Sequence, residues 1–105
     1  MEDSEKIREL QFIEQSLQNI LLQKQAYQMD LSETDAALAE IDSSGEDTYK
    51  IIGQLFLKVK KEKLKKDLEE KKKLMEIRLS SLERQETQLS EKLQKLRDEF
   101  LEKKK

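Results

Sequence analysis

The chain has 105 residues, of which 42% are charged and only 35% hydrophobic, and it contains no proline, tryptophan, cysteine or histidine. The absence of cysteine excludes disulfides and thiolate chemistry, and the absence of histidine removes the commonest general base and metal ligand. Charge is divided unevenly, because residues 1–48 hold twelve acids and three bases whereas residues 49–105 hold eleven acids and eighteen bases. The composition is typical of long helices, and we expect no catalytic residue, cofactor or metal, and no enzyme activity.

The first predicted element is a helix over residues 3–42. Leu10, Leu17, Leu31 and Leu38 repeat on one heptad position, and isoleucines and a tyrosine occupy the position three residues later: Ile13, Ile20, Tyr27 and Ile41. Lys24 and Thr34 interrupt this apolar seam, as polar residues that set register do in coiled coils. Phe12, Leu21 and Leu22 lie outside the seam.

Residues 48–59 form the only β-rich stretch, and we predict a β-hairpin turning at Gly53-Gln54, with the glycine first as in a type II′ turn. This register places Ile51 opposite Phe56 and Ile52 opposite Leu55, so both faces are apolar. A single hairpin with open edges and two apolar faces is unstable alone. The missing strands must therefore come from other chains, and the predicted oligomerisation residues are Tyr49, Ile51, Ile52, Gly53, Leu55, Phe56, Leu57 and Val59.

A second helix is predicted over residues 60–103, with a seven-residue repeat of Leu68, Met75, Leu82, Leu89 and Leu96. Helices of similar length joined by a short connector form an antiparallel pair. Lysines are concentrated at the start of the second helix, and acids at the end of the first. The dipole of each helix disfavours these charges at its own end, but in an antiparallel pair each cluster lies beside the opposite charges of the neighbouring helix. Tyr27 is then expected beside Met75, and Ile13 beside Leu89.

At the far tip, where the two chain ends meet, there is more apolar surface than a two-helix seam can cover. The tip residues are Ile7, Leu10, Phe12, Ile13, Leu93, Leu96, Phe100 and Leu101. Several of them could simply complete the seam. Phe12, Phe100 and Leu101 are better candidates for contact with other molecules, because they exceed the seam or lie at its end.

Four segments carry a resemblance to a known family: Asp47-Thr48-Tyr49-Lys50-Ile51-Ile52-Gly53, Leu55-Phe56-Leu57-Lys58, Leu22-Gln23-Lys24-Gln25 and Leu82-Glu83-Arg84-Gln85-Glu86. With them, the chain resembles the β class of the prefoldin family over nearly its whole length. The resemblance implies a single domain over 1–105 and a hexamer of two α and four β subunits, whose hairpins build an intersubunit β-barrel. It also implies an ATP-independent holdase that binds unfolded or nascent polypeptides at the helix tips and delivers them to a group II chaperonin.

Two other functions fit parts of the sequence. A passive coiled-coil scaffold would explain the heptads but not the doubly apolar hairpin. A nucleic-acid binder would use the nine lysines of residues 58–73, although four acids are interleaved with them. We expect no nucleic-acid partner. No apolar run approaches a membrane span and the first residues are acidic, so we expect a cytoplasmic protein without a membrane partner.

Overall fold

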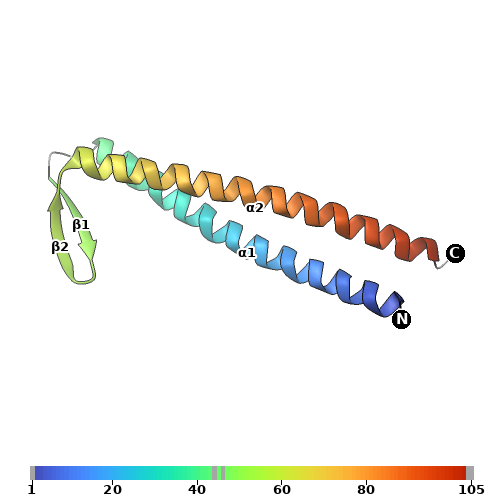
Figure 1. Ribbon diagram of the computed structural model, residues 1–105. Helices are drawn as coiled ribbons and strands as arrows, with labels where there is room; N and C mark the ends of the chain where they lie inside the picture. Colours follow the sequence, from blue (N-terminus) through green and yellow to red (C-terminus); the bar gives the residue numbers. More distant parts are fainter. Residues whose placement is uncertain (1, 44, 46, 104–105) are drawn as a thin grey trace. The chain divides into compact units, whose positions relative to one another are not determined.

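The computed structural model describes residues 2–43, 45 and 47–103 and has four elements in the order helix, strand, strand, helix (Figure 1). Helix α1 spans Glu2–Ser43, strand β1 Thr48–Ile52, strand β2 Leu55–Val59 and helix α2 Lys61–Lys103. The sequence predicted helices over 3–42 and 60–103 and a hairpin over 48–59. Two long helices with a single antiparallel hairpin between them confirm the predicted fold class.

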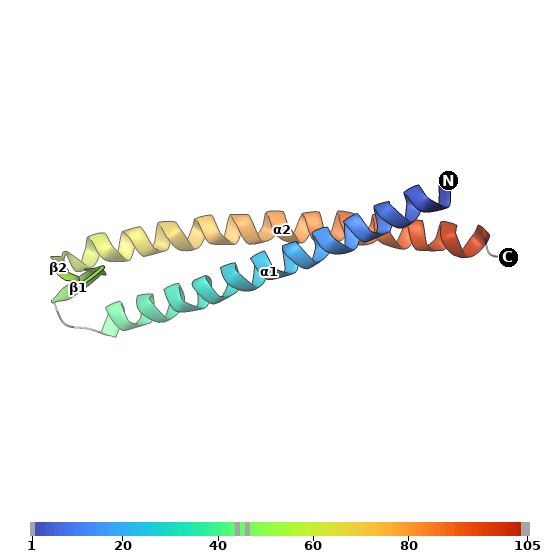
Figure 2. The same cartoon turned by 90° about the horizontal axis from the view of Figure 1, so that it is seen from below.

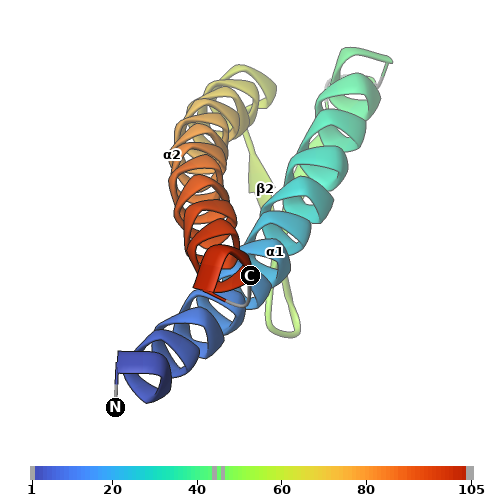
Figure 3. The same cartoon turned by 90° about the vertical axis from the view of Figure 1, so that its right-hand side faces the viewer.

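The chain divides into two compact units, each containing part of both helices. Unit 1 consists of Met1–Ala26 and Leu79–Lys105, and unit 2 of Tyr27–Arg78 with the hairpin. In unit 1 the early residues of α1 are joined to late residues of α2 by ion pairs of Lys6 with Glu99 and of Glu14 with Arg97. The two helix segments are therefore antiparallel there, and Figure 3 looks onto the end where α2 finishes beside α1.

The core of unit 1 is the predicted seam. Ile13, with 1% of its surface exposed, and Ile20 are buried on α1, and α2 contributes the buried side chains of Leu79, Leu82 and Leu96. Within each helix these positions are separated by three, seven or fourteen residues, because only one stripe of a helix can face its neighbour. Heptad spacing therefore located the core of this unit correctly.

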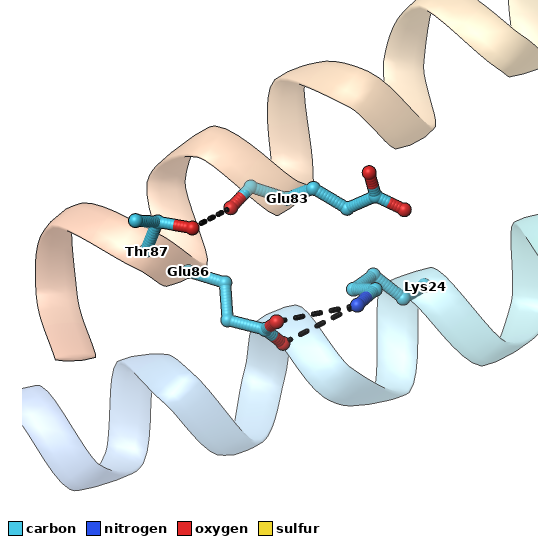
Figure 4. Close-up of polar contacts among 4 residues, drawn as sticks. All are labelled: Lys24, Glu83, Glu86 and Thr87. Carbon is cyan, nitrogen blue, oxygen red and sulfur yellow. Dashed lines mark hydrogen bonds and ion pairs between the residues drawn. The ribbon is translucent and has the colours of Figure 1, made fainter.

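Lys24, the polar seam residue of α1 in unit 1, faces Glu86 of α2 across the two helices (Figure 4). The Lys24 Nζ lies 3.3 Å from one Glu86 carboxylate oxygen and 3.5 Å from the other. Neighbouring Thr87 instead donates its hydroxyl to the Glu83 carbonyl of its own helix, at 3.0 Å. The two charged residues thus satisfy each other in a partly buried position.

In unit 2, Thr34, Ile41 and Met75 are buried between the helices. The Thr34 hydroxyl donates to the Asp30 carbonyl at 2.8 Å, so this polar seam residue leaves no unpaired hydroxyl in the core. Arg78 donates to the Tyr27 hydroxyl at 3.2 Å and its guanidinium lies 5.9 Å from the ring centroid. Arg78 follows three residues after Met75, the residue beside which the sequence placed Tyr27.

The hairpin follows the predicted register. β1 and β2 are antiparallel, with Ile51 opposite Phe56 and Ile52 opposite Leu55. Gly53 has a φ of 61° whereas Gln54 does not have a positive φ, which is the combination that a type II′ turn requires. The other end of the hairpin is closed by the Thr48 hydroxyl, which donates to the Val59 carbonyl at 2.7 Å.

Candidate interaction surfaces

The hairpin exposes apolar side chains on both of its faces. Partners across an antiparallel pair share a face, so Tyr49, Ile51 and Phe56 lie on one face and Ile52, Leu55 and Leu57 on the other. Ile51 is 65% and Phe56 71% exposed, and the other four are also exposed, as is Gly53, whereas Val59 is half-buried. Burying such a side chain stabilises a protein by about 1.5–3 kcal/mol, which the hairpin alone does not obtain.

The two outer edges of the hairpin carry unpaired backbone groups. Next to a two-residue turn, Ile52 and Leu55 form a hydrogen-bonded pair, and the pairs then alternate along the ladder. Tyr49 and Ile51 therefore turn their N–H and C=O outward on β1, as Phe56 does on β2. Within the described residues, the one backbone–backbone hydrogen bond found outside the helices and the hairpin joins Leu64 to Lys60, at 3.0 Å. Both strands thus present edges to which a further strand can be added.

A groove of about 570 Å³ runs between β1 and the helices of unit 2. One wall is formed by the consecutive residues 48–51 of β1, and the other by the helix residues Ala37, Glu40, Ile41, Leu64 and Leu68. Figure 1 and Figure 2 show the hairpin at the start of α2. We call this feature the β1 groove, and it is lined mainly by apolar atoms.

The tip residues of unit 1 differ in exposure. Phe12 is 70%, Leu101 61% and Ile7 43% exposed, and these three are called the exposed tip residues below. Ile13 and Leu96 are buried in the seam, so they are accessible only if the helices separate. Leu10, Leu93 and Phe100 are half-buried. The seam thus takes up part of the predicted tip surface.

Three ion pairs join the lysines of α2 to acids of α1 in unit 2. Lys65 and Lys72 lie 2.8 Å from Asp42 and Asp35, and Lys71 lies 3.2 Å from Asp30. These bonds occupy three of the nine lysines that could have contacted phosphates. The acidic helix alongside therefore weakens the case for a nucleic-acid interface.

The pKa of Asp42 is lowered from its ordinary value of 3.8 by the hydrogen bond and positive charge of Lys65. The same contact raises the pKa of Lys65 above 10.5, and a hydrogen bond to Asp35 raises that of Lys72. The contribution of Asp42 to the stability of the helix pair is complete above its ordinary pKa. It disappears as pH falls through the lowered pKa. The contributions of Lys65 and Lys72 to this stability are complete below pH 10.5 and disappear as pH rises through their raised pKa values.

We expect helix pairing in unit 2 to be weakened by salt, because the ion pairs are exposed. The contact of Asp42 with Lys65 should be insensitive to pH between about 5 and 9, because the pKa of Asp42 is lowered and that of Lys65 is raised. Amide hydrogen exchange of residues 30–42 and 65–72 measures this opening. Asp42→Asn should reduce the salt response, whereas Glu62→Gln, which alters an exposed acid in the same unit, should not. Equal exchange at all salt concentrations would contradict the prediction.

Within the described residues, no group of three or more His, Cys, Asp or Glu side chains is arranged to hold a metal ion. Nor is any helix in this part of the chain long and apolar enough to cross a membrane.

Comparison with known proteins gives the class first: the prefoldin subunit family matches residues 4–105, and the chain belongs to that family. Its members are chaperone cofactors and not enzymes. The similar proteins are prefoldin beta subunits. The prefoldin subunit beta of Thermococcus kodakarensis is 43% identical over 90 residues, covering 84% of this chain and 77% of that protein. That of Pyrobaculum neutrophilum is 41% identical over 86 residues, covering 80% and 68%.

A solved structure agrees. The crystal structure of the prefoldin beta subunit from Thermococcus strain KS-1 matches with a TM-score of 0.83 at 39% identity, covering 91% of this chain and 86% of that one. The resemblance inferred from the hairpin and helix segments is therefore confirmed. It also implies assembly with other prefoldin subunits, which agrees with a hairpin that leaves its apolar faces and its edges uncovered.

The sequence did not reveal the β1 groove. Its helix wall includes Ala37 and Leu64, which fall outside the heptad positions singled out for the seam. Its other wall depends on the angle at which the hairpin leaves α2. A pattern within either element contains no information about that angle.

Proposed function

We propose that this chain is a subunit of an ATP-independent holdase. Through its hairpin it joins an α-type subunit and further β subunits in a cytoplasmic hexamer of two α and four β chains. It holds unfolded or nascent polypeptides at the ends of its helices and delivers them to a group II chaperonin. Residues 1–105 act as one prefoldin-like domain in this proposal.

The observation that carries the proposal is the hairpin, exposed and apolar on both faces in a chain of the prefoldin family. A closed barrel of hairpins covers one face of each ribbon and leaves no strand edge free. A passive scaffold would need only the helices. The eight hairpin residues named from the sequence are therefore proposed as the assembly surface.

Client contact is proposed for the exposed tip residues Ile7, Phe12 and Leu101. They are large, apolar and outside the seam, so an unfolded polypeptide can cover them without separating the helices. Leu10, Leu93 and Phe100, which are half-buried, are proposed to contribute to this contact. Ile13 and Leu96 stabilise the helix pair beneath it.

The test combines native mass with a chaperone assay. The chain is mixed with an α-type prefoldin subunit, the mass of the complex is measured, and the complex is added to an aggregating unfolded protein without ATP. We expect a hexamer that suppresses aggregation and releases its client to a group II chaperonin. A hexamer without suppression would leave the scaffold as the better function, whereas salt-sensitive binding of random-sequence DNA would favour the nucleic-acid binder.

A further inference from the structure

The exposed side of helix α1 is almost free of charge over residues 11–26. Of the eleven exposed residues in this range, Glu14 is the only charged one, and its carboxylate is paired with an arginine of α2. Lys24, the other charged residue of the range, is half-buried and also paired with α2. By contrast, eight of the fifteen exposed residues between 79 and 102 on α2, in the same unit, are charged. The outer side of this part of α1 therefore differs from the rest of a chain in which 42% of the residues are charged.

Amide side chains occupy much of this uncharged side. Gln11, Gln15, Gln18 and Asn19 are exposed, and we call these four residues the amide patch. Residues three or four apart on a helix are neighbours on its surface, so Gln15 lies next to the other three and also next to Phe12, one of the exposed tip residues. Within the part of the chain that the structure describes, none of the four amide groups makes a hydrogen bond.

Free amides of this kind complement the backbone of an extended polypeptide. Each carboxamide offers two N–H donors and a carbonyl acceptor, and an unfolded chain offers one N–H and one C=O per residue that are not used within it. The spacing agrees as well. Gln11 and Gln15 are about 6 Å apart along the helix axis, and groups on one edge of an extended chain recur at about 6.6 Å.

The lack of charge also favours the polypeptide backbone as the occupant. A charged contact surface attracts partners of one sign and repels those of the other. The backbone is neutral and is the same in every polypeptide, so a neutral surface that carries donors and acceptors excludes none of them. Phe12, which is proposed to contact clients, borders the amide patch, so the two surfaces are continuous.

We propose that the amide patch binds the backbone of an extended client segment by hydrogen bonds, while Phe12 covers a neighbouring apolar side chain of the client. The inference rests on the proposed function and deepens it, since it names the part of the client that is recognised. Clients of either charge are held, because the contacts use groups that all polypeptides share. The ring of Phe12 also keeps water from the hydrogen bonds beside it, which strengthens them.

The test uses peptides as clients and the complex of this chain with an α-type subunit. Three unstructured peptides share one apolar sequence and have acidic, neutral or basic flanking residues. In a fourth, which is otherwise the neutral peptide, alternate backbone amides are N-methylated and have lost their donors. We expect the dissociation constants of the first three to lie within about threefold of one another. N-methylation should raise the dissociation constant about tenfold, as the loss of one or two hydrogen bonds does.

Methionine variants connect this effect to the amide patch. Gln11→Met, Gln15→Met and Gln18→Met together keep side-chain length and helix propensity but remove the amide donors and acceptors. In this triple variant we expect N-methylation to change the dissociation constant less than about twofold, because the two changes remove the same hydrogen bonds. The matched control changes the three exposed glutamines of α2 in the same unit and should keep the full effect: Gln85→Met, Gln88→Met and Gln94→Met.

Equal binding of the N-methylated and the neutral peptide would overturn the proposal, as would an effect of N-methylation that persists in the triple variant. A changed mass of the complex in the triple variant would also overturn it, because the amide patch would then join subunits. These three results leave the proposed function standing as long as the unmodified complex suppresses aggregation. A complex that binds no peptide and suppresses no aggregation would overturn both.

Discussion

A chain carrying Ile51→Lys and Phe56→Lys is expected to remain monomeric or dimeric, with both helices intact. Ile51 and Phe56 face each other across the hairpin and are largely exposed, so neither contributes to the core of the isolated chain. In an assembly their face of the ribbon would be covered. An unpaired lysine buried there costs several kcal/mol unless it finds a partner, and two opposite each other repel.

Native mass measures this effect, and the chain supplies a matched control. Leu74 and Ile77 are also exposed and apolar, but they lie on α2, so Leu74→Lys and Ile77→Lys add the same charge away from the hairpin. The control should assemble like the unmodified chain. If the hairpin variant kept the full oligomer mass, the assembly role of these two residues would be wrong.

Replacing the exposed tip residues Ile7, Phe12 and Leu101 with serine is expected to abolish most suppression of client aggregation while assembly continues. The three side chains are outside the seam, so serine removes apolar contact surface without opening a cavity. Each lost contact with a client removes about 1–3 kcal/mol of apolar burial. Light scattering of an aggregating client protein, to which only the variant hexamer is added, measures the suppression of aggregation.

Two comparisons separate contact from stability in that experiment. Leu21→Ser and Leu22→Ser change exposed leucines of unit 1 outside the proposed surface and should preserve suppression. Ile13→Ala should lower the free energy of unfolding by about 2–5 kcal/mol, because its side chain is fully buried. Full suppression by the triple serine variant would show that clients bind elsewhere.

The hairpin was the most predictable part of the chain. Gly53-Gln54 fixes the turn, and a two-residue turn fixes every pair that follows, so Ile51 and Phe56 could be placed opposite each other from the sequence. The seam was predictable for a similar reason, since the repeat of Ile13 and Ile20 selects one face of α1.

Contacts between elements were less predictable. Heptads state which face of a helix is buried but not which polar side chains meet across the pair, so the hydrogen bond from Arg78 to Tyr27 was not predicted. Heptads also do not give the depth of burial of a seam residue at the tip. Leu10 and Ile13 are both seam positions, yet Leu10 is half-buried and Ile13 is 1% exposed.

The contact between Lys24 and Glu86 bears on how unit 1 reaches its final alignment. The corresponding α2 positions one heptad away are Leu79 and Leu93, so sliding one helix by seven residues would leave the lysine and the glutamate against leucine. The leucine repeats alone tolerate such a slip, because one leucine replaces another. A partly buried charge without its partner does not. The pair thus favours the observed alignment of the two helices in unit 1 over one that is shifted by a heptad.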